Sequence, residues 1–303
     1  MPVSANRIFH CNVNCSSLDT SLRFYESLGL TKVIRTVPSK HQNGNAFGLD
    51  VVAWDAWMMH SDDGMEGLSL DLLQWLTPLP TGQAQDVNGD IGFNRLVFYS
   101  RDVEAAVKQS IAAGGSLVSE PITFDTGHHP VTVAMVRDPD GLPVQLVQGE
   151  KNSIAQIVVN CADLDESVAY YGDVMGLEIL MPPMEQSWPG PLFGQDGDIN
   201  VRAALLRDPG SVFVVALVQW PGVDAATKRE RKANELGLFR MAWSTPDCAS
   251  DEGVIRAAGS VPFVATEELS VGDDLPLLLV LFWPGPNGEC LELIETTNRS
   301  GAL

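Results

Sequence analysis

Two segments of the chain, residues 7–30 and 153–177, are similar in sequence at a constant offset. Asp19 and Asp165, for example, occupy matching positions 146 residues apart. Each segment has the pattern of a β-strand, a short turn and an amphipathic helix that ends at a glycine. A repeat of this kind limits the chain to folds built from copies of one supersecondary unit.

A second pair of similar segments, 93–121 and 238–267, carries the same strand and helix pattern. Each continues through further strands to a tight turn, Asp-Gly at 140–141 or Asn-Gly at 287–288. These dipeptides are strong hairpin signals. We therefore predict an α+β chain of four strand–helix–three-strand modules in two domains, 1–149 and 150–303. The predicted modules span 5–80, 90–149, 152–222 and 235–297.

Charge and composition exclude several functional classes. The 303 residues include 39 acidic and 19 basic side chains, for a formal net charge of −20, and 45% are hydrophobic. Such a charge repels nucleic acid and anionic membranes, so we expect neither as a partner. Five scattered cysteines without a C-x-x-C pair predict reduced thiols, and no secretory leader is evident, so we expect a cytoplasmic protein.

The strand, turn and helix of 7–30 and 153–177, followed by Asp-Pro-Asp-Gly at 138–141, resemble the βαβββ module of the vicinal oxygen chelate family. This family contains glyoxalases, extradiol dioxygenases and bleomycin-resistance proteins. The resemblance implies that modules pair into two cupped mixed sheets, with helices on the convex side. The ligand or metal then lies inside a cup.

Ligand positions in this family lie on the first and last strand of each module. Carried over in module order, these positions hold His10 and Asp71, Arg95 and Gln145, Gln156 and Ala216, and Arg240 and Glu292. Strand alternation predicts that His10 faces the cup, whereas Phe9, Cys11 and Val13 face the helix. The two arginines depart from the family, because a guanidinium cannot ligate a metal.

Two pairings of the modules remain open from the sequence. If module one pairs with two, neither cup has a good ligand set from these positions, unless His60 approaches His10 and Asp71 to give a His/His/Asp set. If module one pairs with four, one cup holds His10, Asp71, Glu292 and Arg240. The resemblance then implies one divalent metal (Fe, Mn, Zn or Ni) on His10, Asp71 and Glu292. The alternative is no metal, with Arg95 and Arg240 in place of the usual ligands and ion pairs joining Asp71 to Arg95 and Glu292 to Arg240.

Further residues are candidates for the same site. His10, Arg240 and His60 are candidate catalytic residues, because imidazoles transfer protons and a guanidinium stabilises negative charge. The candidate substrate-binding residues are Arg95, Gln145, Gln156, Trp57 and Trp243. His128 and His129 are expected as loop residues, and the alternative for them is an acid–base role at a cup rim.

Two functions fit this set of residues. The first is a glyoxalase- or dioxygenase-like enzyme (isomerase, lyase or dioxygenase) acting on a small oxygenated organic molecule. The second is a non-catalytic protein that sequesters a drug or metabolite, in the manner of bleomycin-resistance proteins. In both cases the partner is a small molecule, and the chain is expected as a monomer or homodimer.

Overall fold

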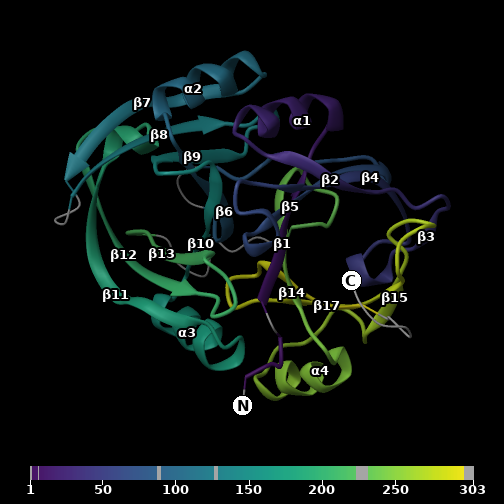
Figure 1. The fold of residues 1–303 in the computed structure, drawn as a ribbon. Helices are drawn as coiled ribbons and strands as arrows, with labels where there is room; N and C mark the ends of the chain where they lie inside the picture. The colour runs from purple at the N-terminus through teal and green to yellow at the C-terminus, as the bar shows by residue number, and fades with distance from the viewer. Residues whose placement is uncertain (1, 6, 87–89, 126–128, 223–230, 297–303) are drawn as a thin grey trace.

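The computed structural model describes residues 2–5, 7–86, 90–125, 129–222 and 231–296, and it contains the four predicted modules (Figure 1). Module one comprises β1 (Arg7–Asn14), α1 (Leu18–Ser27), β2 (Thr31–Thr36), β3 (Gln42–Asn43), η1 (Asn45–Phe47), β4 (Val51–His60), η2 (Gly64–Glu66) and β5 (Ser69–Thr77). Module two comprises β6 (Gly92–Ser100), α2 (Val103–Ala112), β7 (Ser116–Asp125), β8 (Pro130–Arg137) and β9 (Pro143–Gln148). Module three comprises β10 (Ser153–Asn160), α3 (Leu164–Ala169), η3 (Tyr170–Val174), β11 (Glu178–Pro189), η4 (Gly190–Phe193), β12 (Asp198–Arg207) and β13 (Val214–Gln219). Module four comprises β14 (Gly237–Ser244), α4 (Cys248–Ala257), β15 (Glu267–Leu269), β16 (Leu278–Pro284) and β17 (Cys290–Thr296).

The modules pair one with four and two with three. One sheet has the strand order β15-β16-β17-β14-β1-β5-β4-β2, with β3 beside β4, and the other has β11-β12-β13-β10-β6-β9-β8-β7. Paired modules are joined through their first strands, which run antiparallel: β1 pairs with β14, and β10 pairs with β6. The two sheets therefore cut across the predicted domains 1–149 and 150–303, because each sheet draws one module from each half.

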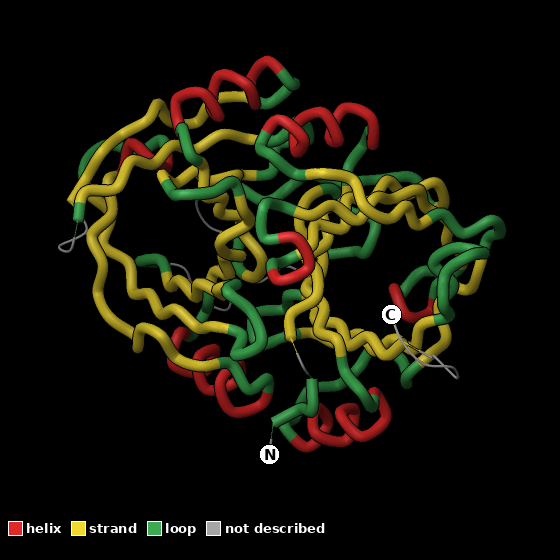
Figure 2. Tube along the Cα trace, in the orientation of Figure 1, coloured by secondary structure: helices red, strands yellow, loops and turns green. Residues whose placement is uncertain are grey.

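Both sheets curl, with helices on the convex side (Figures 1 and 2). Helices α1 and α2 lie together on one side of the molecule, and α3 and α4 lie on the opposite side. We call the concave face of the β1-containing sheet the first cup and that of the β10-containing sheet the second cup. No helix in the described residues is long and apolar enough to cross a membrane.

Buried polar contacts repeat between the halves. The indole Nε1 of Trp75 donates to Oδ1 of Asn14 over 3.0 Å, and Trp220 donates to Asn160 over 2.9 Å. Trp75 lies in the last strand of module one and Trp220 directly follows the last strand of module three, so each bond ties the end of a module to its first strand. Since all four side chains are at most 5% exposed, these bonds fix strand register inside the core.

Tyrosines on the helices connect modules that belong to different sheets. Tyr25 on α1 donates its hydroxyl to Asp138 of module two over 3.0 Å, and Tyr171 donates to Glu289 of module four over 2.6 Å. All four groups are buried. The five cysteines are free and buried, in agreement with the expected thiols.

Candidate active site in the first cup

Four adjacent strands, β5, β1, β14 and β17, form the floor of the first cup. They bring together Asp71, His10, Arg240 and Glu292, which come from opposite ends of the chain. This is the set that the sequence predicts for the pairing of module one with module four. All four side chains are buried, with exposed fractions of 2–6%.

The guanidinium of Arg240 bridges the two carboxylates. Its Nη2 donates to Oδ2 of Asp71 over 2.6 Å, and its Nε donates to Oε2 of Glu292 over 2.8 Å. Asn12 also donates to Oδ2 of Asp71, over 3.2 Å, and so helps to orient that carboxylate. The ion-pair partner of Asp71 is thus Arg240, and the alternative prediction of Arg95 is wrong because Arg95 lies in the other sheet.

Burial alone would lower the pKa of Arg240. The charges of Glu292 and Asp71 outweigh this effect and raise the pKa above its ordinary value. Arg240 therefore remains a cation in the cup floor. Its aromatic neighbour is Phe47, whose ring centroid lies 5.8 Å from the guanidinium carbon.

His10 stands beside this bridge. Its Nε2 is 3.5 Å from Oε2 of Glu292, and its ring contacts Phe9 edge-on at 5.4 Å between centroids. In the described part of the chain, neither ring nitrogen of His10 has a hydrogen-bond partner, and neither has Nη1 of Arg240. Because buried polar atoms are almost always hydrogen-bonded, these three atoms mark a place where a ligand would bind.

Above the floor lies a cavity that is open to solvent. Its walls are mainly apolar, and modules one and four both contribute to them. The lining residues include Phe9, His10, Phe47, Trp54, Met58 and Arg240. A largely apolar cavity with a few convergent polar groups is the usual form of a small-molecule site.

The predicted metal-ligating residues do not fit a metal in this arrangement. Among the described residues, no three His, Cys, Asp or Glu side chains are grouped to hold a metal ion. The space between Asp71 and Glu292 is taken by the guanidinium of Arg240, which already engages an oxygen of each. Two carboxylates committed to a cation in this way are not free to ligate a second one.

The second cup has the same arginine without the carboxylates. Arg95 donates to Oε1 of Gln145 over 3.0 Å and lies beneath the rings of Trp188 and Phe193, at 5.7 and 5.3 Å. In the second cup, the strand position that corresponds to Asp71 is occupied by Ala216. Burial lowers the pKa of Arg95 to about 9, since no ion-pair partner in the described residues offsets the desolvation. Gln156 on β10 is half-buried.

Several predicted site residues lie elsewhere. Trp57 and Trp243 face the helix-side core rather than the cup, so their assignment as substrate-binding residues is corrected. Successive residues of a strand point to opposite faces. Met58 and Arg240 face the cup, so Trp57, next to Met58, and Trp243, three residues after Arg240, point to the other face. His60 ends β4 outside the cavity lining, and burial together with Arg7 lowers its pKa.

The predicted orientation of Phe9 is also corrected. It was predicted to face the helix, but it lines the cavity. A register shift between Ile8 and His10 in the pairing of β1 with β14 disturbs the strand alternation at this point. His128 lies outside the described residues, and the neighbouring His129 lies before β8.

Sequence reasoning missed Phe47, which covers the guanidinium of Arg240. A signal was present in the repeat: Phe47-Gly48 and Phe193-Gly194 stand 146 residues apart. Both glycines end a short 3-10 helix in the left-handed region, at φ 66° and 69°. The repeated pair thus encodes a turn that places an aromatic ring over the arginine of each cup.

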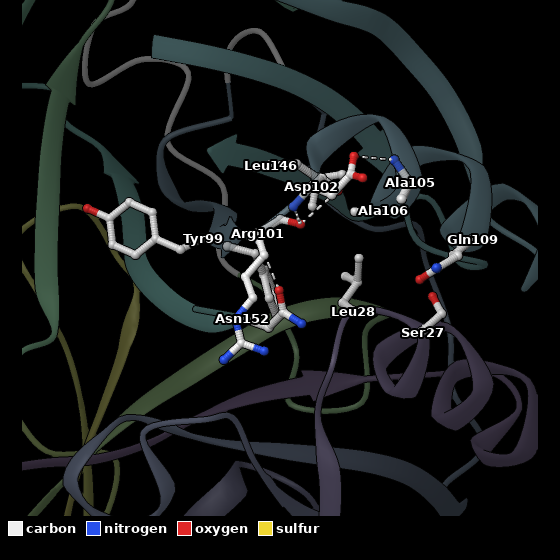
Figure 3. Close-up of a pocket in the computed structure, with 12 residues that line it drawn as sticks. Ser27, Leu28, Tyr99, Arg101, Asp102, Ala105, Ala106, Gln109, Leu146 and Asn152 are labelled. Carbon is white, nitrogen blue, oxygen red and sulfur yellow. Dashed lines mark hydrogen bonds between the residues drawn. The ribbon is translucent and has the colours of Figure 1, made fainter. Parts of the chain in front are cut away.

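A separate pocket lies between α1, α2 and the ends of β6 and β9 (Figure 3). Its polar groups already serve the fold. The backbone NH of Arg101 donates to Asn152 over 3.1 Å, and Asp102 accepts from the NH of Ala105 over 2.9 Å to cap α2. This pocket is therefore a weaker candidate than the first cup.

Residues 7–146 match the family model of the Glyoxalase/Bleomycin resistance protein/Dioxygenase superfamily. Among solved structures, glyoxalase I from Zea mays is 17% identical with a TM-score of 0.69, over 95% of this chain and 92% of that chain. A candidate dioxygenase from Bacillus subtilis is 15% identical with a TM-score of 0.60, over 97% and 86%. No curated protein sequence matches the chain. The structural similarities establish the fold of the whole chain.

Proposed function

Since residues 7–146 match the family model of the Glyoxalase/Bleomycin resistance protein/Dioxygenase superfamily and the fold is that of glyoxalase I, we propose that the chain binds a small oxygen-bearing organic molecule in the first cup and moves a proton on it. His10 is the proposed proton-transferring group, and Arg240 binds the oxygen on which negative charge develops. The observation that carries this proposal is the set of unpartnered atoms, Nδ1 and Nε2 of His10 and Nη1 of Arg240, beneath an apolar cavity.

The chemistry follows from these groups. An imidazole is the side chain best suited to take up and return a proton near neutral pH. A fixed N–H donor aimed at a carbonyl or hydroxyl oxygen stabilises charge that forms there. If His10 removes a proton from one substrate atom and returns it to another, the reaction is an isomerisation. If the substrate expels a leaving group after the proton is removed, the reaction is that of a lyase.

The charge of the floor narrows the ligand class. Asp71, Glu292 and Arg240 together have a formal charge of −1, so Arg240 is not free to clamp an anion. The apolar walls, including Phe47 and Trp54, favour a largely apolar body. We therefore infer a neutral or cationic ligand with a carbonyl or hydroxyl group. One chain contributes every residue of this site, so the proposed site needs no partner copy.

Members of this superfamily typically use a divalent metal. The proposal for this chain does not route a step through one, because Arg240 occupies the space between Asp71 and Glu292. Sequestration is the second candidate function. It is favoured by the apolar lining of the cavity.

The experiment that tests catalysis is proton exchange in D₂O. A panel of neutral α-hydroxyketones is incubated with the wild type, and loss of the carbon-bound proton signal is followed by NMR. General acid–base catalysis contributes about 10²–10⁴-fold, so His10→Gln is expected to slow exchange by this factor while binding is retained. The matched control is Gln156→Ala, at the corresponding position of the second cup.

Exchange in the wild type that is lost in His10→Gln supports the enzyme. Binding without exchange in either protein contradicts catalysis on this panel and favours sequestration. Exchange that is equal in both proteins contradicts the role of His10.

A further inference from the structure

We propose that the guanidinium of Arg240 is a built-in cation that replaces a divalent metal between Asp71 and Glu292. The wild-type cup accordingly takes up no such metal, and replacing Arg240 by a ligating side chain creates a metal site there. This inference concerns binding alone and goes beyond the proposed proton transfer. It holds equally for an enzyme and for a sequestering protein.

One guanidinium contacts both carboxylates of the cup floor. Nη2 and Nε of one guanidinium contact Oδ2 of Asp71 at 2.6 Å and Oε2 of Glu292 at 2.8 Å. The two carboxylates come from β5 and β17, on either side of the central strands, and converge on a single cation. The floor of the cup therefore contains a cation, the guanidinium of Arg240, between the two carboxylates.

His10 completes the arrangement. Its Nε2 lies 3.5 Å from Oε2 of Glu292, without a hydrogen bond. Two ligand atoms that share one zinc ion at tetrahedral angles are separated by roughly 3.4 Å, given bond lengths near 2.1 Å. His10 and Glu292 thus already stand at the spacing of co-ligands, and the guanidinium is the group that keeps a metal out.

The burial of the floor makes a cation obligatory. Asp71 and Glu292 are 3% and 2% exposed, and water cannot screen two carboxylates at that depth. Arg240 supplies the compensating charge without an ion from solution. When Arg240 is exchanged for a neutral imidazole, the cup needs a cation again, and a divalent ion is the natural replacement.

The second cup provides an internal comparison. Arg95 occupies the position that matches Arg240, but Ala216 and Gln145 stand where the first cup has its carboxylates. Gln156 stands in place of His10. An imidazole introduced at position 95 would therefore meet no acidic ligand, so the same substitution in the two cups is expected to have different results.

The test is a titration with Ni²⁺ alone, by calorimetry, on full-length protein without a histidine tag. The proteins are wild type, His10→Ala, Arg240→His, Arg240→His combined with His10→Ala, and Arg95→His as the matched control. We expect one equivalent of Ni²⁺ on Arg240→His and an affinity at least tenfold lower in the double variant. Wild type is expected to bind no more Ni²⁺ than His10→Ala, and Arg95→His no more than wild type. Thermal melting of Arg240→His is expected to shift upward with Ni²⁺.

Two results would overturn the proposal. The first is stoichiometric Ni²⁺ binding to the wild type that is lost in His10→Ala, which would show that a metal displaces the guanidinium. The second is an Arg240→His protein that binds no Ni²⁺, or that stays unfolded after refolding with Ni²⁺, since the metal then cannot substitute for the guanidinium. Neither result depends on the exchange assay, so failure of this inference is distinguishable from failure of the proposed function.

Discussion

The Nη2 atom of Arg240 donates a hydrogen bond to Oδ2 of Asp71 over 2.6 Å, although the two residues are 169 positions apart. The bond crosses from module four to module one, so it exists only because β1 and β14 pair. The same contact joins the two ends of the chain and forms the charged floor of the cup. Fold stability and site geometry are therefore expected to respond together when it is changed.

Removal of the arginine should destabilise the first cup and leave the stability of the second nearly unchanged. Arg240→Met leaves two buried carboxylates without their cation, and loss of one partner of a buried ion pair costs about 3–5 kcal/mol. Arg95→Met removes a buried cation that has no carboxylate partner among the described residues, so its cost should be near zero. Urea unfolding of both variants measures the free energies. Equal destabilisation would contradict the charge compensation assigned to Arg240.

A carboxylate introduced beside Arg95 should stabilise the protein. Gln145 already accepts a hydrogen bond from Arg95 Nε over 3.0 Å, so Gln145→Glu converts this contact into a charge-assisted bond. Such bonds are worth about 1 kcal/mol more than neutral ones. We expect the free energy of unfolding to rise by about this amount. In the background of Arg95→Met the same change should destabilise, which serves as the control.

Asp138 should give the protein a pH-dependent stability in the acidic range. Burial raises the pKa of this carboxyl from 3.8 to about 7, despite the backbone NH of Leu142 and the hydroxyl of Tyr25 that donate to it. Folding therefore favours the protonated form. Its contribution is fully present below pH 3.8 and is lost as pH rises through 7. At about 1.4 kcal/mol per unit, the full effect is about 4 kcal/mol at most.

The measurement is the difference in unfolding free energy between wild type and Asp138→Asn at pH 5 and pH 8. The difference removes the contribution of all other titrating groups. The wild type should lose stability relative to the variant between these values. A difference that is the same at both pH values would be inconsistent with a raised pKa.

Narrowing the first cup should abolish ligand binding without unfolding the chain. Met58 lies opposite Asp71 in the pairing of β4 with β5 and lines the cavity, so Met58→Trp fills space directly above the floor. Nile red, a neutral apolar dye, should bind the wild type and fail to bind the variant. Val212→Trp, at a position 60% exposed, is the control and should bind normally. Unchanged dye binding in Met58→Trp would place the dye outside this cup.

Much of the first cup was predictable because the repeat fixes which strand positions face inward. His10, Asp71, Arg240 and Glu292 were identified from the first and last strands of their modules, and they meet as expected for one of the two pairings. Phe9 was assigned to the wrong face because the register shift in β1 depends on its partner strand. Trp57 and Trp243 were proposed as lining of an aromatic cavity, and aromatic character does not indicate the face of a strand on which a side chain lies.

The sequence by itself determined the four modules, since strand period, helix amphipathicity and Asp-Gly or Asn-Gly turns are local signals. It did not determine which first strands meet, because pairing among β1, β6, β10 and β14 depends on contacts across the whole chain. Only the tertiary structure placed Arg240 between Asp71 and Glu292 and left Arg95 without a carboxylate. Whether a buried charge is compensated depends on distances of a few ångströms between strands far apart in sequence, and local patterns carry no such information.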